Sequence, residues 1–197
     1  MTTVVVGGHS RNVGKTSVAA GLIHAFSKYP WTAIKITSHQ HWSIPLSDSN
    51  DKDKICDIYE EVDRDGTSDT SRFLAAGASR ALWVRIKNDF TNASVQPLLP
   101  ILQSNPFVMI ESNRILRLLQ PDLFIMVLRY DIEDFKESAR SALKLADAVV
   151  VVNSNLAMPQ WKGISPELLS EIPQFATADP QIVPPELVNF VRSRLPY

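Results

Sequence analysis

A short β-branched run near the start of the chain leads into a glycine-flanked loop that ends in a lysine and a threonine. The segment is residues 3–17, Thr-Val-Val-Val-Gly-Gly-His-Ser-Arg-Asn-Val-Gly-Lys-Thr-Ser, and a helical pattern follows it. A strand, such a loop and a helix, in this order, form a phosphate-binding P-loop. Gly14 lets the backbone approach phosphate oxygens, and the N–H groups that open the helix point at the anion. The sequence therefore predicts a site for a nucleoside triphosphate, GTP or ATP.

The polar residues at the end of this loop have specific expected roles. Lys15 can reach the β- and γ-phosphates as a point charge, and the Thr16 hydroxyl can ligate Mg²⁺. The alternative is a Gly-Lys-Thr sequence that opens a helix and binds nothing. We expect the nucleotide to contact the loop itself, at Gly8, His9, Ser10, Arg11, Asn12, Val13, Gly14, Lys15, Thr16 and Ser17.

The composition excludes several classes of protein. With 197 residues, 45% of them hydrophobic, the chain is expected to form one compact domain over residues 1–197. Twenty basic and 21 acidic residues give a net charge of −1, so no global field attracts nucleic acid or an anionic membrane. No run approaches the length of about 20 apolar residues that spans a membrane, and no signal peptide is visible. The single cysteine, Cys56, excludes an internal disulfide and suits the cytoplasm.

Apolar runs alternate with helical patterns along the chain. Several runs, such as residues 149–152, are entirely apolar, as strands covered on both faces must be. The predicted strands are residues 3–7, 32–37, 80–87, 107–111, 122–128 and 148–153, and the predicted helices are residues 14–28, 69–76, 134–146 and a last one after Pro185. This alternation predicts an α/β fold, a doubly wound and mostly parallel sheet with helices on both faces, as in P-loop NTPases.

One acidic stretch interrupts this alternation. Residues 48–69 contain nine acidic and three basic residues and little apolar content. We expect a solvated, mobile surface insertion near residues 47–68. The functional alternative is a lid that orders over bound nucleotide and metal.

Polar residues follow several of the predicted strands, and ligands of open α/β sheets bind beyond these carboxyl ends. Lys35 lies on the second strand, where we expect it to contact the nucleotide. Glu111 follows four apolar residues, as a Mg²⁺-binding or water-orienting carboxylate would. The alternative for Glu111 is the cap of a helix. Asn153 could read either purine, because an amide both donates and accepts hydrogen bonds. His39 and His41 share a strand face, and their role stays open.

Two resemblances narrow the class of P-loop protein. Five residues separate Gly8 from Gly14, and five-residue loops ending in Val-Gly-Lys-Thr resemble those of dethiobiotin synthetase and the cobyrinic acid amidating enzymes, which belong to the SIMIBI class. Residues 33–39, Ala-Ile-Lys-Ile-Thr-Ser-His, resemble the Ile-Lys-His-Thr-His-His segment of the B-type proteins of molybdopterin-guanine dinucleotide biosynthesis. Residues 69–78, Asp-Thr-Ser-Arg-Phe-Leu-Ala-Ala-Gly-Ala, are similar to the Asp-Ser-x-Arg-x-x-x-Ala-Gly-Ala of that family, and Ile110-Glu111 to its Val-Glu-Gly.

The second resemblance implies a GTP-preferring, weakly hydrolytic protein that assists a partner enzyme in molybdenum cofactor biosynthesis. It implies that Lys15 and Thr16 hold phosphate and Mg²⁺, and that Asp69 and Glu111 complete the metal shell. Lys15, Asp69 and Glu111 are then the expected catalytic residues, and Thr16, Asp69 and Glu111 the metal ligands. Asp69 could otherwise be only a helix cap.

Three functions remain open at this point. The first is the accessory NTPase, with slow hydrolysis coupled to a client protein. The second is an ATP-dependent ligase or kinase of the dethiobiotin synthetase or cobyrinate amidation type, acting on a small carboxylate near Lys35, His39 and Glu111. The third is a module that senses nucleotide without hydrolysing it. An exposed apolar strand at a sheet edge could support a homodimer.

Overall fold

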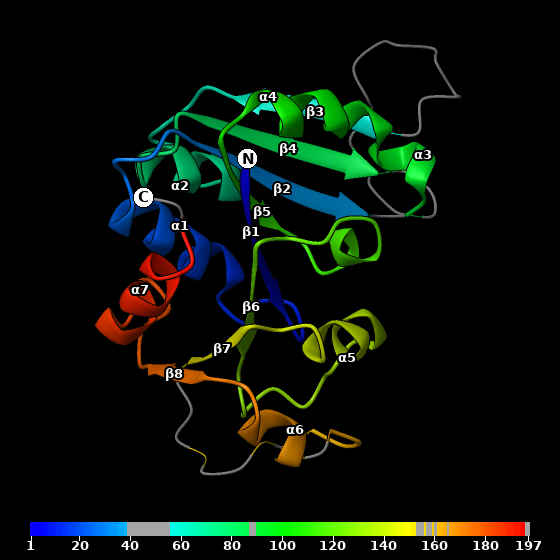
Figure 1. The fold of residues 1–197 in the computed structure, drawn as a ribbon, viewed down its shortest axis with the longest axis vertical. Coiled ribbons are helices and arrows are strands. Elements are labelled where there is room, and N and C mark those ends of the chain that lie inside the picture. The colour runs from blue at the N-terminus through cyan, green and yellow to red at the C-terminus, as the bar shows by residue number, and fades with distance from the viewer. Residues whose placement is uncertain are drawn as a thin grey trace.

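The computed structural model describes residues 1–38, 56–86, 90–152, 156, 159, 161–164 and 166–195. Within these ranges eight strands form one sheet, in the order β3-β4-β2-β5-β1-β6-β7-β8 (Figure 1). All neighbouring strands are parallel except β3 and β4, which are antiparallel. The strands are β1 (Thr2–Gly8), β2 (Trp31–Ser38), β3 (Cys56–Glu61), β4 (Arg80–Ile86), β5 (Phe107–Glu111), β6 (Leu123–Leu128), β7 (Ala148–Val152) and β8 (Gln174–Thr177).

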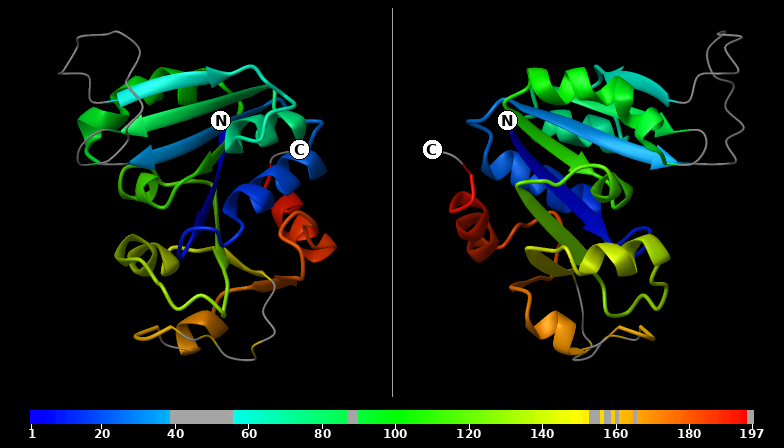
Figure 2. Two further views of the ribbon diagram at one scale, coloured as in Figure 1. Left: turned by 180° about the vertical axis from the view of Figure 1, so that it is seen from behind. Right: turned by 45° about the vertical axis from the view of Figure 1, so that its right-hand side comes forward.

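Helices cover both faces of this sheet (Figures 1 and 2). Helices α1 (Lys15–Ala25), α2 (Asp69–Ala75) and α7 (Pro185–Arg192) pack on one face. The other face carries α3 (Asn92–Val95), α4 (Leu99–Ser104), α5 (Glu137–Leu143) and α6 (Pro166–Ser170). Two short 3₁₀ helices, η1 (Gln96–Leu98) and η2 (Arg114–Arg117), complete the described elements. The predicted α/β fold, mostly parallel with helices on both faces, is confirmed.

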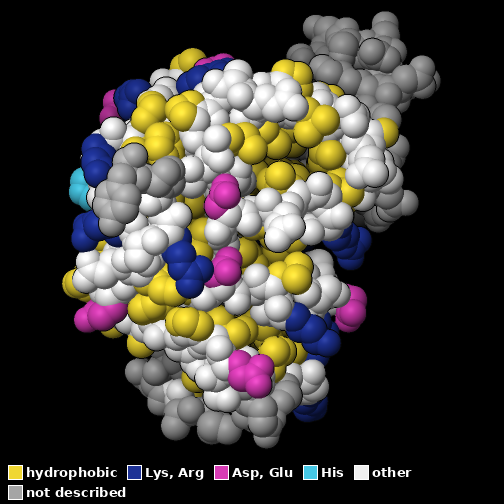
Figure 3. Space-filling model, in the orientation of Figure 1, with side chains coloured by type: hydrophobic (Ala, Val, Ile, Leu, Met, Phe, Trp, Pro, Cys, Tyr) yellow, Lys and Arg dark blue, Asp and Glu magenta, His cyan; other side chains and the backbone are white. Residues whose placement is uncertain are grey.

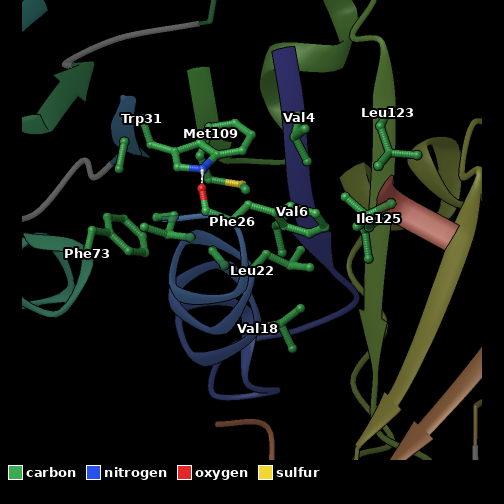
Figure 4. Packing of buried hydrophobic residues seen from close by; sticks show 14 of the residues in the cluster. Val4, Val6, Val18, Leu22, Phe26, Trp31, Phe73, Met109, Leu123 and Ile125 are labelled. Atoms are coloured by element: carbon green, nitrogen blue, oxygen red, sulfur yellow. Dashed lines mark hydrogen bonds between the residues drawn. The ribbon is translucent and has the colours of Figure 1, made fainter. Parts of the chain in front are cut away.

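The predicted helical stripes form the contact between α1 and the sheet. Val18 and Leu22 are buried against strand residues such as Val4 and Val6 (Figure 4). Past the end of α1, the Trp31 indole donates a hydrogen bond to the Phe26 carbonyl oxygen, at 3.0 Å. This packing fixes the position of α1, and therefore of the loop before it, relative to β1.

The acidic segment differs from its predicted state. Residues 39–55 lie outside the described residues, but Cys56–Glu61 forms the edge strand β3, where we expected a surface loop. Cys56 and Asp57 are both buried, and Asp57 forms an ion pair with the buried Arg85 of β4 at 3.4 Å. Arg85, which is distant in the sequence, therefore compensates the buried charge of Asp57, although the local sequence pattern predicts that Asp57 is exposed to solvent.

The surface agrees with the near-neutral composition. On the face that Figure 3 shows, acidic and basic side chains are interspersed, and no large area carries one sign of charge. None of the described helices is long and apolar enough to cross a membrane.

Candidate nucleotide site

The P-loop joins the central strand β1 to helix α1. Between Gly8, which ends β1, and Lys15, which begins α1, Asn12 and Gly14 have positive φ angles of 57° and 100°. A side chain at Gly14 would be strained by this φ, and its Cβ would lie 2.7 Å from the Cβ of Pro180. The loop borders a pocket of about 1260 Å³. The loop thus borders this pocket with a backbone that only glycine adopts without strain at position 14.

Lys15 points back across its own loop. Its ammonium donates a hydrogen bond to the Ser10 carbonyl oxygen at 2.7 Å. Burial lowers the pKa of Lys15 to about 8, and repulsion from Lys35 and Lys136 adds to the shift, although Glu111 opposes it. The ammonium is therefore a poorly solvated cation, and an arriving phosphate would stabilise its charged form.

Two carboxylates, a lysine and a hydroxyl meet beside Lys15. The Thr16 hydroxyl donates a hydrogen bond to Glu111 Oε2 at 2.8 Å, and Lys35 Nζ contacts the other oxygen, Glu111 Oε1. Lys35 Nζ also lies 3.0 Å from Asp69 Oδ2. The Glu111 side chain is 1% exposed and that of Asp69 is 42% exposed, so the cluster reaches from the core to the pocket. Lys35 is thus the only cation in contact with either carboxylate among the described residues.

The electrostatics of this cluster follow from its contacts. Burial opposes the charge on Lys35, but the carboxylates of Glu111 and Asp69 outweigh it and raise the pKa of Lys35. Burial likewise opposes the charge on Asp69, but the Lys35 ammonium outweighs it and lowers the pKa of Asp69. Both groups are therefore charged at neutral pH.

The sheet register explains why these residues meet. Lys35 of β2 and Glu111 of β5 are paired positions on adjacent parallel strands. Ser68 caps α2, because its hydroxyl accepts a hydrogen bond from the Ser71 N–H at 3.0 Å. Asp69 is therefore not the cap, and its carboxylate is left for Lys35. Glu111 likewise bonds to Thr16 and Lys35 and does not cap a helix.

The oxygen atoms of this cluster suit a hard cation. Within the described ranges, no group of three or more His, Cys, Asp or Glu side chains is arranged to hold a metal ion. Two carboxylates and one hydroxyl are instead the kind of partial set from which Mg²⁺ binds together with phosphate oxygens and water.

The structure corrects the prediction for His9. Its side chain is fully buried, its Nδ1 lies 2.9 Å from the Asp134 carbonyl oxygen, and the Arg129 N–H donates to its Nε2 at 3.0 Å. Burial lowers the pKa of His9 to about 4, so the ring is neutral. The imidazole anchors the loop to the segment after β6 and does not line the pocket. A glycine-flanked motif does not specify which way such a side chain points.

The remaining loop residues line the pocket in different ways. Arg11 and Asn12 are exposed, while Val13 is buried in the core. The Ser10 hydroxyl donates to Asp134 Oδ2, and the Ser17 hydroxyl accepts from Arg72 Nη2 at 2.7 Å. Ser10 and Ser17 thus have protein partners, whereas Arg11 and Asn12 face solvent. The predicted residues Asn153, His39 and His41 lie outside the described residues.

Sequence reasoning missed the residues that hold the loop from outside. Asn113 Nδ2 donates to the Gly8 carbonyl oxygen at 2.8 Å, and the Gly8 N–H donates to Asn113 Oδ1 at 2.9 Å. The Lys136 N–H donates to the His9 carbonyl oxygen at 3.0 Å. Asn113 follows β5, so the polar sequence Glu111-Ser-Asn was the available signal.

Comparison with known proteins identifies the fold. No protein-family model matches the chain, and no curated protein sequence matches it.

Among solved structures, HypB from Helicobacter pylori, in complex with nickel, aligns with a TM-score of 0.52 and 16% identity over 98% of this chain and 86% of HypB. LpxK from Aquifex aeolicus, in complex with ATP, aligns with a TM-score of 0.50 and 19% identity over 89% of this chain. The chain has the fold of a P-loop NTPase. The alignment with LpxK covers 53% of LpxK, so this chain spans about half of that protein's length. A MobB protein homolog from Bacillus stearothermophilus aligns with a TM-score of 0.45 and 17% identity over 98% of this chain and 99% of that protein.

Proposed function

We propose that this chain binds a Mg²⁺-nucleoside triphosphate at the P-loop and hydrolyses it slowly. The observation that carries the proposal is the meeting of Lys15, Thr16, Lys35, Asp69 and Glu111 beside a loop of P-loop conformation. If the Gly-Lys-Thr sequence only opened a helix, nothing would explain why two carboxylates and a second lysine lie beside it. This combination suits phosphoryl transfer, because cations stabilise the transferring group while carboxylates hold metal and place water.

Each residue has a role in this proposal. Thr16, Asp69 and Glu111 would hold Mg²⁺, which when bound neutralises charge on the β- and γ-phosphates. Lys15 would bind the β- and γ-phosphate oxygens, and Lys35 would keep the Asp69 carboxylate ionised. Glu111 or Asp69 would orient a water whose oxygen bonds to the γ-phosphorus while the bond to the β,γ-bridging oxygen breaks.

The choice of GTP and the accessory role rest on the motifs of the sequence. Residues 33–39 and 69–78 and Ile110-Glu111 resemble the B-type proteins of molybdopterin-guanine dinucleotide biosynthesis, and Lys35, Asp69 and Glu111 come from these motifs. Lys35 contacts both Asp69 and Glu111, and these contacts support the proposal that the three motifs act together in one site. We therefore propose GTP as the nucleotide, a cytoplasmic location, and a client enzyme in molybdenum cofactor biosynthesis.

A kinase or ligase is the second candidate, favoured by the size of the pocket. At about 1260 Å³ the pocket exceeds the roughly 300–1,000 Å³ typical of small-molecule sites. The space beyond one nucleotide could hold an acceptor, as the ATP-dependent ligases of the SIMIBI class would require.

A single screen separates these functions. Thermal shift and phosphate release would be measured with ATP, GTP, CTP and UTP, each with Mg²⁺ or with EDTA. Mg²⁺-dependent stabilisation by GTP with slow phosphate release supports the accessory NTPase. Preference for ATP, with release that rises only when a small acid is added, supports the ligase or kinase. Stabilisation without release indicates a sensing module, and no stabilisation by any nucleotide refutes the proposal.

A further inference from the structure

Three cations that line the nucleotide pocket have no partner of opposite charge within the part of the chain that the structure describes. Arg11, Arg114 and Lys136 all border the pocket, and none of their side chains forms an ion pair or hydrogen bond with the described residues. The other cations of this wall are engaged: Lys15 with Ser10, Lys35 with Asp69 and Glu111, Arg72 with Ser17, and Arg129 with Asp131. The unpaired cations thus form a distinct group, which we call the cation trio.

Three adjacent strands deliver the trio. Arg11 follows β1, Arg114 follows β5, and Lys136 follows β6, and the order in the sheet is β5-β1-β6. Asn113, next to Arg114, hydrogen-bonds to Gly8 in both directions, and the Lys136 N–H bonds to the His9 carbonyl oxygen. The backbones that carry Arg114 and Lys136 are therefore fixed to the P-loop itself, beside the phosphate site.

Arg11 and Arg114 both repel the Lys136 ammonium. Burial lowers the pKa of Lys136, and the charges of Arg11 and Arg114 lower it further, although Asp134 opposes them. Among the described residues, Asp134 forms no ion pair with any of the three cations, and its Oδ2 accepts the Ser10 hydroxyl. Like charges placed together without a counter-ion favour an anionic ligand.

We propose that Arg11, Arg114 and Lys136 form a second anion site, which binds the phosphate group of a small phosphorylated substrate beside the nucleotide. The inference rests on the proposed function, because it places this substrate next to a bound triphosphate. The pocket volume of about 1260 Å³ leaves room for it. Three charges, two of them on planar guanidinium groups, match a phosphate dianion better than a carboxylate monoanion.

The test uses inorganic phosphate as the probe. The full chain is first saturated with Mg²⁺ and the imido analogue of its preferred nucleotide, so that the P-loop is filled. Phosphate is then titrated by calorimetry into wild type, Arg114→Gln and Lys136→Gln. Arg117→Gln and Lys144→Gln are matched controls, because both side chains are exposed and lie outside the pocket. Arg114→Lys restores the charge, and thermal melting verifies that each variant folds.

We expect one saturable phosphate site on the nucleotide-loaded wild type. Each Gln variant weakens phosphate binding about tenfold, as loss of a charged hydrogen bond implies, with nucleotide affinity changed less than about twofold. Arg114→Lys recovers most of the phosphate affinity, and the controls match wild type. The inference is overturned if loaded wild type binds no phosphate, if acetate binds equally well, or if the Gln variants weaken nucleotide as much as phosphate. A wild type that binds no nucleotide refutes the proposed function itself.

Discussion

Replacement of Lys15 by methionine should make the nucleotide-free protein more stable while it removes nucleotide binding. The reason is that Lys15 is a half-buried, poorly solvated cation whose counter-ion, as we propose, is the nucleoside triphosphate. Methionine keeps most of the side-chain volume and removes the charge. Such a gain is expected where a residue serves ligand binding at the expense of the fold.

The magnitude follows from the pKa of Lys15. Burial lowers it from 10.5 to about 8, and at about 1.36 kcal/mol for each pH unit the charged form is disfavoured by about 3 kcal/mol. Loss of the 2.7 Å hydrogen bond to the Ser10 carbonyl returns about 1 kcal/mol. The net gain at pH 6–7 is therefore about 2 kcal/mol, or a rise of about 4–8 °C in Tm for a chain of this length.

The stability that Lys15→Met gains over wild type should decrease as the pH rises. Because the folded pKa lies below the unfolded one, the penalty is complete below pH 8 and vanishes as pH rises from 8 to 10.5. Urea unfolding at pH 6 and pH 9.5 would show the advantage of Lys15→Met shrink by about 2 kcal/mol. The exposed Lys144→Met is the control and shows no such trend. A Lys15→Met protein that is less stable than wild type at pH 6, or whose difference does not change with pH, refutes this reasoning.

Three further predictions follow from the site. Glu111→Gln should lower Mg²⁺-dependent phosphate release by at least about 100-fold, because the carboxylate that orients water and metal is lost. Nucleotide binding in the presence of EDTA should stay intact. Unchanged phosphate release would exclude this role of Glu111. Asn113→Ala should lower the free energy of unfolding by about 1–3 kcal/mol and weaken nucleotide binding, because both Gly8 hydrogen bonds vanish. Urea unfolding and calorimetry measure the two effects, and an unchanged nucleotide affinity would contradict the role of Asn113 in holding the P-loop. Nucleotide affinity should fall by up to about tenfold for each pH unit above 8, since Lys15 must be protonated to bind phosphate; a flat profile to pH 9.5 would contradict it.

The central strands could be predicted because their own sequences, without knowledge of the strands they pair with, show that they are buried. Runs such as Val149–Val152 are short, apolar throughout and β-branched, as is typical of a strand covered on both faces. The edge strands β3 and β8 could not be predicted in this way. Asp57 of β3 is buried because Arg85 lies across from it, and the ladder that pairs them is visible only in the folded chain. Strand β8 has four residues that are exposed or partly exposed.

The candidate site was predictable in its residue types and not in its contacts. Lys15, Thr16 and Glu111 stand in patterns whose chemistry is specific to phosphate and Mg²⁺. That Lys35 bridges Glu111 and Asp69 depends on the β2–β5 register and on the capping of α2 by Ser68. The side-chain direction of His9 depends on the segment after β6, which lies more than 100 residues away in the sequence.

The most direct test of the account is the affinity of the chain for a Mg²⁺-nucleoside triphosphate with and without the Lys15 ammonium. Calorimetry would compare wild type, Lys15→Ala and the exposed control Lys144→Ala, with the nucleotide that stabilises wild type most. We predict that Lys15→Ala binds at least about tenfold more weakly, as loss of a charged hydrogen bond implies, and that the control binds like wild type. Equal affinity of Lys15→Ala and wild type would contradict the assignment of this loop as the phosphate site.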